Sequence, residues 1–240
     1  MPRLVDTGHM PFTEPRELLR TGTLDPRTVA LIWLLLDGGV PLVVAGSAAA
    51  TERLGLASAM LSLDPRRRWV VLDSDEEAVT ADRLAALLRG GSGVGITLAA
   101  DDLDAARARF VAGGLPADAL RRLGVVVIAE EAGPGLRCTV VHYLRPTERD
   151  AQGHLQRRPP AVLAAWDEHA DRFEDYAWGI TPELADRVDR AQADLEERQA
   201  DRTRLLAGMA ADDDYTARVT ACLLYTSPSP GDGETHLVCR

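Results

Sequence analysis

Short apolar runs alternate with helical stretches through the first half of this chain of 240 residues. Aliphatic runs bounded by Gly, Pro and Asp are typical of strands that are buried on both faces of a sheet. The expected strands cover residues 41–45, 69–72, 94–98 and 125–128, and the expected helices cover residues 14–20, 26–36, 52–63, 80–89, 104–111 and 116–123. This alternation predicts an α/β fold, a mostly parallel sheet with helices on both faces.

The second half of the chain follows a different pattern. Residues 138–146, 160–166 and 173–178 read as strands joined by turns, which predicts a small antiparallel β meander. A threonine cap followed by proline then predicts one long C-terminal helix from Thr181 to about residue 210. Its apolar positions are sparse, so we expect most of this helix to face solvent or a partner.

These patterns divide the chain into five parts. They are an N-terminal extension at 1–22, an α/β core at 23–132, the meander at 133–180, the long helix at 181–211 and a disordered tail at 212–240. Within the tail, residues 222–230 (Cys-Leu-Leu-Tyr-Thr-Ser-Pro-Ser-Pro) resemble the translation of a transposase adapter used in sequencing libraries. We therefore interpret residues 222–240 as a sequencing artefact and expect the natural C-terminus to be missing.

The connection after the first expected strand has the layout of a nucleotide-binding P-loop. An apolar run passes through small residues into a helix, at the place where the pattern G-x-x-x-x-G-K-[ST] would stand. The candidate cofactor-binding residues are the members of this loop: Gly46, Ser47, Ala48, Ala49, Ala50, Thr51, Glu52 and Arg53. Thr51 replaces the second glycine and Glu52 replaces the lysine. The chain contains no lysine that could substitute, because all 27 of its basic residues are arginine.

Both replacements oppose phosphate binding. A phosphate loop turns successive N–H groups inward and needs glycine where φ is positive, and another residue there costs about 1–2 kcal/mol. A carboxylate in place of the lysine repels phosphate by roughly 4 kcal/mol at about 4 Å and an effective dielectric near 20. The simpler interpretation is that Thr51 caps an ordinary helix and Glu52 lies in its first turn.

From Leu19 to about Ala211 the chain resembles the RecA-like motor domain of type II and type IV secretion and pilus-assembly ATPases, in the branch of the tight-adherence pilus motors. The segments that carry the resemblance are 22–25 (Gly-Thr-Leu-Asp), 41–46, 122–127, 142–146 and 177–184. The resemblance implies a RecA-like P-loop NTPase-type sheet. It also implies a hexameric ATPase that uses a Walker A loop, Walker B acids and a histidine box.

The chain departs from that family at all three motifs. Glu52 replaces the Walker A lysine, and Ala99 stands where segment 93–101 would carry the histidine. About 20 residues separate the strand ending at Asp73 from that segment, too few for the further strand that bears the Walker B acids in the family. We therefore expect no catalytic residues.

Other residues offer little for catalysis or metal binding. Asp73, Glu130 and Glu131 follow expected strands and resemble Walker B endings, but such acids hold Mg²⁺ only together with phosphates. The acidic residues at 73–77 are interpreted as a solvated loop and a helix start. The five histidines lack metal-ligand spacing, and His142 is interpreted as structural. The cysteines, Cys138, Cys222 and Cys239, are too few and too scattered for a disulfide framework or a zinc site, so no metal is expected.

Charge and hydropathy exclude further classes. A net charge of −10 argues against non-specific nucleic-acid binding, and Arg66-Arg67-Arg68, the one tight basic cluster, is interpreted as a solvated loop. The longest apolar run, Val29–Leu36, is too short to span a bilayer. We expect a cytoplasmic protein that binds no nucleic acid and does not insert into membranes.

The leading hypothesis is a non-hydrolysing pseudoenzyme related to the secretion and pilus motors. It would act in assembly or regulation, as a homo-oligomer or in a hetero-oligomer with motor subunits, and needs no cofactor. Two alternatives stay open. One is a weak ATPase that binds ATP and Mg²⁺ with Arg53 in place of the lysine. The other is a decayed or misassembled reading frame.

Overall fold

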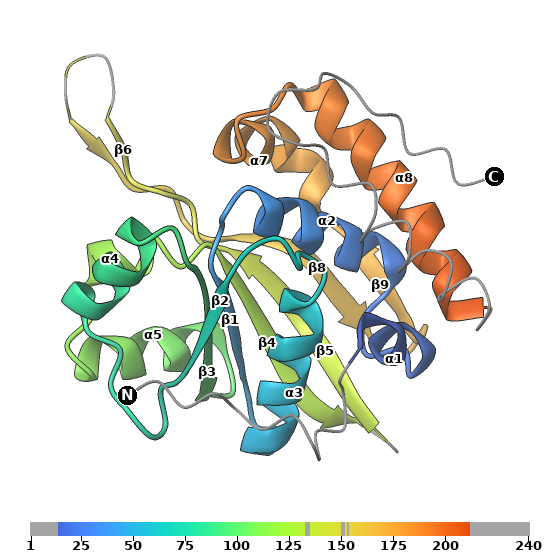
Figure 1. Ribbon diagram of the computed structural model, residues 1–240, viewed down its shortest axis with the longest axis horizontal. Coiled ribbons are helices and arrows are strands. Elements are labelled where there is room, and N and C mark those ends of the chain that lie inside the picture. The colour runs from blue at the N-terminus through green and yellow to red at the C-terminus, as the bar shows by residue number, and fades with distance from the viewer. Residues whose placement is uncertain (1–13, 133–134, 150–151, 153, 212–240) are drawn as a thin grey trace.

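The computed structural model describes residues 14–132, 135–149, 152 and 154–211 (Figure 1). Its central feature is a seven-stranded sheet in the order β2-β3-β1-β4-β5-β8-β9. The strands are β1 (Leu42–Gly46), β2 (Trp69–Asp73), β3 (Gly93–Ala99), β4 (Val125–Ala132), β5 (Gly135–Tyr143), β8 (Ala161–Asp167) and β9 (Arg172–Asp175). A separate two-stranded ribbon joins β6 (Glu148–Arg149) to β7 (Leu155–Gln156).

The first four strands are parallel, as the alternating pattern predicts. β1 lies between β3 and β4, and β2 forms one edge of the sheet. The three strands predicted as a meander continue the same sheet, because β5 pairs with β4, β8 with β5 and β9 with β8, each in the antiparallel sense. The last of them is shorter than predicted, because residues Ala177–Ile180 form a 3₁₀ helix, η1.

Helices cover both faces of the sheet, also as predicted. One face packs against α1 (Pro15–Arg20), α2 (Pro26–Asp37), α3 (Ala50–Leu61), α7 (Thr181–Arg187) and α8 (Gln192–Ala211); the other packs against α4 (Ala81–Arg89), α5 (Leu103–Ala112) and α6 (Ala117–Leu120). Successive strand residues point to opposite faces. Val44 and Val127 therefore belong to the first core, and Val43 and Val126 belong to the second.

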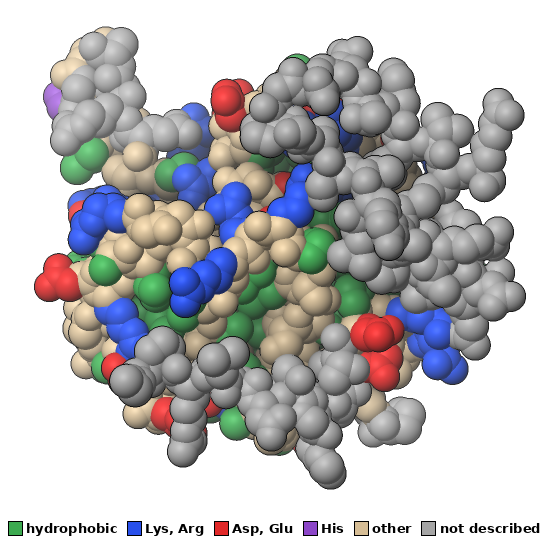
Figure 2. Space-filling model, viewed as in Figure 1, with side chains coloured by type: hydrophobic (Ala, Val, Ile, Leu, Met, Phe, Trp, Pro, Cys, Tyr) green, Lys and Arg blue, Asp and Glu red, His purple; other side chains and the backbone are tan. Residues whose placement is uncertain are grey.

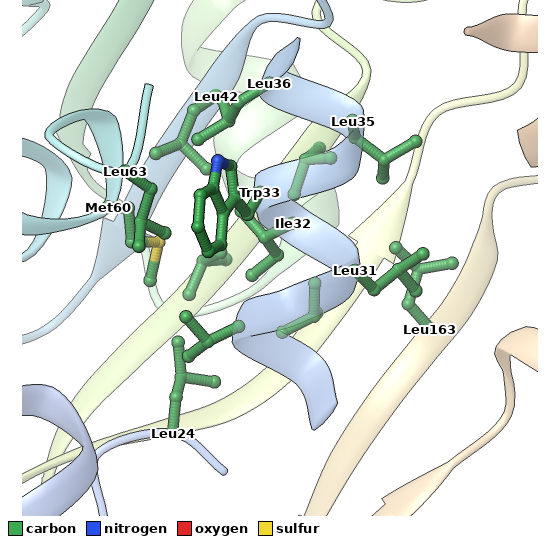
Figure 3. Close-up of a cluster of buried hydrophobic side chains, with 14 of the residues drawn as sticks. Leu24, Leu31, Ile32, Trp33, Leu35, Leu36, Leu42, Met60, Leu63 and Leu163 are labelled. Atoms are coloured by element: carbon green, nitrogen blue, oxygen red, sulfur yellow. The ribbon is translucent and has the colours of Figure 1, made fainter. Parts of the chain in front are cut away.

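Helix α2 is the centre of the first core. Its residues Thr28 to Leu36 are all buried, which is the pattern of a helix enclosed on every side. Figure 3 shows the Trp33 side chain beside Met60 and Leu63, next to β1. The predicted Asp25 cap is confirmed, because its carboxylate accepts the N–H groups of Arg27 and Thr28 at 2.9 and 3.1 Å.

The prediction of one long helix from residue 181 to 210 is wrong. The chain forms two helices, α7 and α8, and between them Asp189 has a φ of 54°. A helix of L-residues cannot continue through this left-handed conformation. Val188 packs so closely on Gly38 at the end of α2 that a Cβ added to Gly38 would lie 2.3 Å from the Val188 side chain. The break therefore lets α8 turn back along α2, as Figure 1 shows.

The arginine cluster lies in a loop with Arg66 and Arg68 exposed, as the sequence predicts, but Arg66 and Arg67 also make specific contacts. Arg66 and Arg67 form ion pairs with Asp64, and Arg66 reaches Asp37; the two carboxylate side chains are only 4% and 6% exposed. Arg67 also donates to the backbone carbonyl of Asp37 at 3.2 Å. Carbonyls at the end of a helix lack helical partners. The loop between α3 and β2 therefore closes the end of α2.

Arg202 attaches α8 to the same point. Its guanidinium pairs with the Asp37 carboxylate and lies 4.1 Å from the centre of the Trp33 ring. Burial lowers the pKa of Arg202 and the nearby Asp37 carboxylate opposes this shift. A cation held between a carboxylate and an indole face combines an ion pair with a cation–π contact. Arg202 thus links the C-terminal helix to the end of α2.

We expect Arg202→Ala to lower the free energy of unfolding by about 3 kcal/mol, because it removes one partner of a buried ion pair. Urea unfolding would measure this loss. Arg204→Ala is the matched control on the same helix, since the Arg204 side chain is 77% exposed and pairs with the exposed Asp201. The control should change the stability by less than about 0.5 kcal/mol. Equal effects of the two substitutions would contradict this role of Arg202.

Candidate functional site

The candidate loop lies at the carboxyl edge of the parallel strands, where open α/β sheets bind ligands. β1 ends at Gly46 and α3 begins at Ala50, with Ala49 as its N-cap. The prediction that Thr51 caps this helix is wrong, because the helix begins earlier and Thr51 lies inside its first turn. Glu52 lies in the first turn as predicted. Its carboxylate accepts the N–H of Ala49 at 3.2 Å, so it occupies a backbone donor that a phosphate would need.

Gly46 is required by the packing of the sheet. Its φ is 146°, and a Cβ at this position would lie 1.8 Å from the carbonyl oxygen of Ala129 on β4. The Ala129 carbonyl also accepts the N–H of Ala48 at 3.5 Å, and the Gly46 carbonyl accepts the N–H of Ala100 at 3.4 Å. A glycine at this place therefore has a structural cause that does not involve phosphate.

Arg53 fills the inner side of the loop. Its side chain is 4% exposed, and its Nη1 donates to the carbonyls of Gly46, at 3.4 Å, and Ala48. The loop thus presents carbonyl oxygens to a cation, whereas a phosphate loop presents N–H groups to an anion. In the pattern G-x-x-x-x-G-K-[ST], Arg53 stands at the position of the hydroxyl residue that binds Mg²⁺. A guanidinium cannot coordinate a metal ion.

Asp75 joins this loop to its neighbours. Its carboxylate lies 2.6 Å from Nη2 of Arg53 and 2.8 Å from Nη2 of Arg109 on α5, and it accepts the N–H of Ala99 at 2.9 Å. Arg109 also donates to the Ala99 carbonyl. Asp75 lies in an exposed turn, as the sequence predicts, but its side chain is only 24% exposed because it bonds to these partners. The sequence could not predict this contact, because Arg53, Asp75 and Arg109 follow three different strands. No short spacing in the sequence relates the three residues.

The other acidic candidates do not form a metal site. Asp73 accepts the N–H of Asp75 at 3.0 Å, so it holds the loop after β2 in place. Glu130 and Glu131 lie within β4, which runs on to Ala132 instead of ending near residue 128. Glu130 accepts the hydroxyl of Thr139 at 3.2 Å. Within the described ranges, no group of three or more His, Cys, Asp or Glu residues is placed to hold a metal.

The segment between β2 and β3 contains one helix and no strand. Residues 74–92 form α4 and its turns, as the short spacing predicts. β2 pairs directly with β3, with Val71 opposite Gly95. β3 ends at Ala99, whose N–H is bound by Asp75. This edge of the sheet therefore carries the side chains of Arg53, Asp75 and Arg109.

His142 and Cys138 lie on β5, which is separated from β1 by β4. Burial lowers the pKa of His142, and Asp104 on the neighbouring α5 opposes this shift. Burial raises the pKa of the Cys138 thiol, so the thiol stays protonated. Cys222 and Cys239 lie outside the described residues, as does the segment interpreted as an adapter.

No protein-family model matches the sequence, and no curated protein matches it. These comparisons identify no family, so the resemblance to the secretion motors is carried by the residues alone. Among the helices of the described ranges, none combines the length and the apolar character needed to cross a membrane.

The packing at Gly46 yields a test with a matched control. We expect Gly46→Ala to lower the free energy of unfolding by about 3 kcal/mol or more, because the added Cβ meets the β4 backbone. Gly91 also has a positive φ, 72°, but a Cβ there meets nothing within 4 Å. Gly91→Ala should therefore cost only the backbone term of about 1–2 kcal/mol. Chemical unfolding would compare the two, and equal losses would show that β4 does not approach Gly46 closely.

The burial of His142 predicts a dependence of stability on pH. The unfolded chain, whose histidine has the ordinary pKa of 6.5, takes up the proton before the folded chain does. The free energy of unfolding should therefore fall as the pH drops below about 6.5 toward the lower pKa of the folded state. His142→Gln should flatten this slope when urea unfolding is compared at about pH 7.5 and about pH 5. Parent and variant curves with the same slope would assign the pH dependence to other groups.

Proposed function

We propose that this protein is a non-hydrolysing relative of the secretion and pilus-assembly motor ATPases. On this proposal it retains a RecA-like core for contacts within a motor complex. Two lines of argument support the proposal. One is the resemblance in segments such as 22–25, 41–46 and 177–184. The other is the strand–turn–helix connection from β1 to α3, which keeps the layout of a phosphate loop while its interior is occupied.

The contacts of Arg53 carry the proposal. A phosphate that entered the loop would have to displace the guanidinium from the carbonyls of Gly46 and Ala48 and from the Asp75 carboxylate. The freed carbonyls would then face the anion without a donor, which costs about 1–3 kcal/mol for each buried group. The carboxylate of Glu52 adds a repulsion of roughly 4 kcal/mol at about 4 Å. These terms all act against nucleotide binding.

The same contacts argue against a weak ATPase in which Arg53 replaces the lysine. An arginine in that role must direct its guanidinium toward the ligand. The Arg53 side chain is instead 4% exposed and points to loop carbonyls. Arg109 is more accessible, at 46% exposure, but it is engaged by Asp75 and Ala99. The observations favour a pseudoenzyme over an enzyme that has exchanged lysine for arginine.

The internal consistency of the sequence argues against a decayed reading frame. Two separate hydrophobic cores lie on the two faces of the sheet. Helices α2, α4 and α5 each begin at a side chain that accepts an N–H of the first turn: Asp25, Thr80 and Asp102. Agreement between local capping and global packing is characteristic of sequences selected to fold. A binding role, as a homo-oligomer or with motor subunits in the cytoplasm, then accounts for a preserved domain without a working site.

Calorimetric titration of the full chain with Mg-ATP tests the proposal. We expect no saturable heat from the parent protein, and none from Glu52→Lys, because Arg53 still fills the loop. Saturable binding by the parent in the micromolar to low-millimolar range would overturn the proposal. Binding by the Glu52→Lys variant but not by the parent would show that Arg53 leaves the loop readily.

A combined variant serves as the positive control for this titration. Thr51→Gly, Glu52→Lys and Arg53→Thr together restore the phosphate-loop pattern at this connection. We expect this variant to gain Mg-ATP binding, provided that its thermal unfolding transition remains cooperative. A gain in the combined variant and none in the parent would attribute the loss of binding to these three positions.

A further inference from the structure

Backbone N–H and C=O groups along β2 point outward from the sheet edge. In a parallel ladder every second residue directs both its N–H and its C=O to the same neighbour. The carbonyl of Arg68 accepts from Gly93, and the N–H of Ser74 donates to Thr97, so the even-numbered residues of β2 bond to β3. The N–H and C=O groups of Trp69 and Val71 therefore point away from the sheet. Within the described ranges, no hydrogen bond reaches these four groups.

The two edges of the sheet differ in how they discourage further pairing. β9, at the far edge, is a short strand that carries Arg172, Glu174 and Asp175. Charges and short length are the usual protection of an edge strand. β2 has the sequence Trp-Val-Val-Leu-Asp and contains no Pro and no basic residue. β2 is also short and ends at the charged Asp73, but its first four residues, Trp69–Leu72, carry no charge and have high strand propensity.

The hydrophobic cores are also incomplete at this edge. Trp69 and Val71 are partly buried against the first core. Val70 is partly buried against the second core, together with Leu87 and Leu88 of α4. Figure 1 draws β2 across the front of the molecule, and Figure 2 shows hydrophobic side chains at the surface in the same area. A neighbour at this edge would cover both sets of side chains at once.

The charges that flank β2 indicate which neighbour fits. The strand is preceded by Arg66-Arg67-Arg68 and followed by Asp75-Glu76-Glu77. If a second β2 lies antiparallel with Val71 opposite Val71, the basic flank of each copy meets the acidic flank of the other. Arg68 and Glu76, which are both exposed and lie just beyond the two ends of β2, then come to the same end of the joined strands. Opposite charges at the same end favour this antiparallel arrangement over a parallel one.

We propose that two copies of this chain associate through their β2 strands about a two-fold axis at Val71. This contact would join the two sheets into one continuous sheet. The Val71 N–H of each copy donates to the Val71 carbonyl of the other. The Trp69 carbonyl accepts the outward N–H of Asp73 in the second copy, and the Trp69 N–H donates to that Asp73 carbonyl, which also accepts the N–H of Glu77 within its own chain. A two-fold contact uses the same surface on both copies and closes on itself, so it yields a dimer. This interface is independent of the fate of the nucleotide loop.

The mass of the full chain in solution tests the proposal. We expect a particle of twice 25.9 kDa that dissociates on dilution and more readily at high salt. Val71→Pro removes the central donor without removing a hydrogen bond from the single copy, because that N–H faces outward, and it should yield a particle of 25.9 kDa. Val71→Lys places like charges opposite each other at the axis and should have the same effect. The Val→Lys control is Val111→Lys on α5, where the side chain is 51% exposed, and it should leave the dimer intact.

A disulfide trap gives an independent readout if a Val71 variant folds poorly. Residues directly opposite in a hydrogen-bonded antiparallel pair have Cα atoms about 5.5 Å apart, which is within disulfide range. Under oxidation, Val71→Cys should form a covalent dimer, while the parent chain and Val111→Cys should not. A monomer at all concentrations would overturn the proposal, and so would a dimer that survives both Val71→Pro and Val71→Lys. If residues 1–13 of the same chain cover this edge, the protein will be a monomer at all concentrations.

Discussion

The ion pair between Arg53 and Asp75 is the contact on which the carboxyl edge of the parallel strands depends. Through it the turn after β1, the loop after β2, the end of β3 and helix α5 share one set of hydrogen bonds. Because the Arg53 guanidinium is 4% exposed, removing either partner would leave a charge or a carbonyl without compensation in the interior. The same contact that stabilises this edge also fills the space in which a phosphate loop would hold its ligand.

The two faces of the sheet are stabilised in different ways. On one face α2 is enclosed between the sheet and α8, and the Asp37 carboxylate connects the ends of three segments through Arg66 and Arg202. On the other face α4, α5 and α6 are shorter and cover only part of the sheet. Stability is thus concentrated around α2, whereas Trp69, Val70 and Val71 at the β2 edge are only partly buried.

Much of the fold could be predicted from the sequence because its signals are local. The apolar runs that become β1, β2 and β3 and the caps at Asp25 and Thr80 act within a few residues, and their elements lie where they were expected. The helix break at Asp189 was missed because it depends on Val188 packing against the distant Gly38. β4 runs past its apolar segment to Ala132 because β5 pairs with it, which placed Glu130 within the strand. Long-range contacts override local propensity at each of these positions.

Residue identity is enough to show that the loop after β1 lacks the second glycine and the lysine of a phosphate loop, and with them the required backbone freedom and charge. The period of the apolar residues is likewise enough to predict the α/β class. The inward turn of Arg53, its contact with Asp75 and the need for Gly46 beside β4 follow instead from how distant segments pack. These facts depend on which segments meet at the end of the sheet. That arrangement arises because both faces of the sheet must be buried at once. A short stretch of sequence carries no information about it.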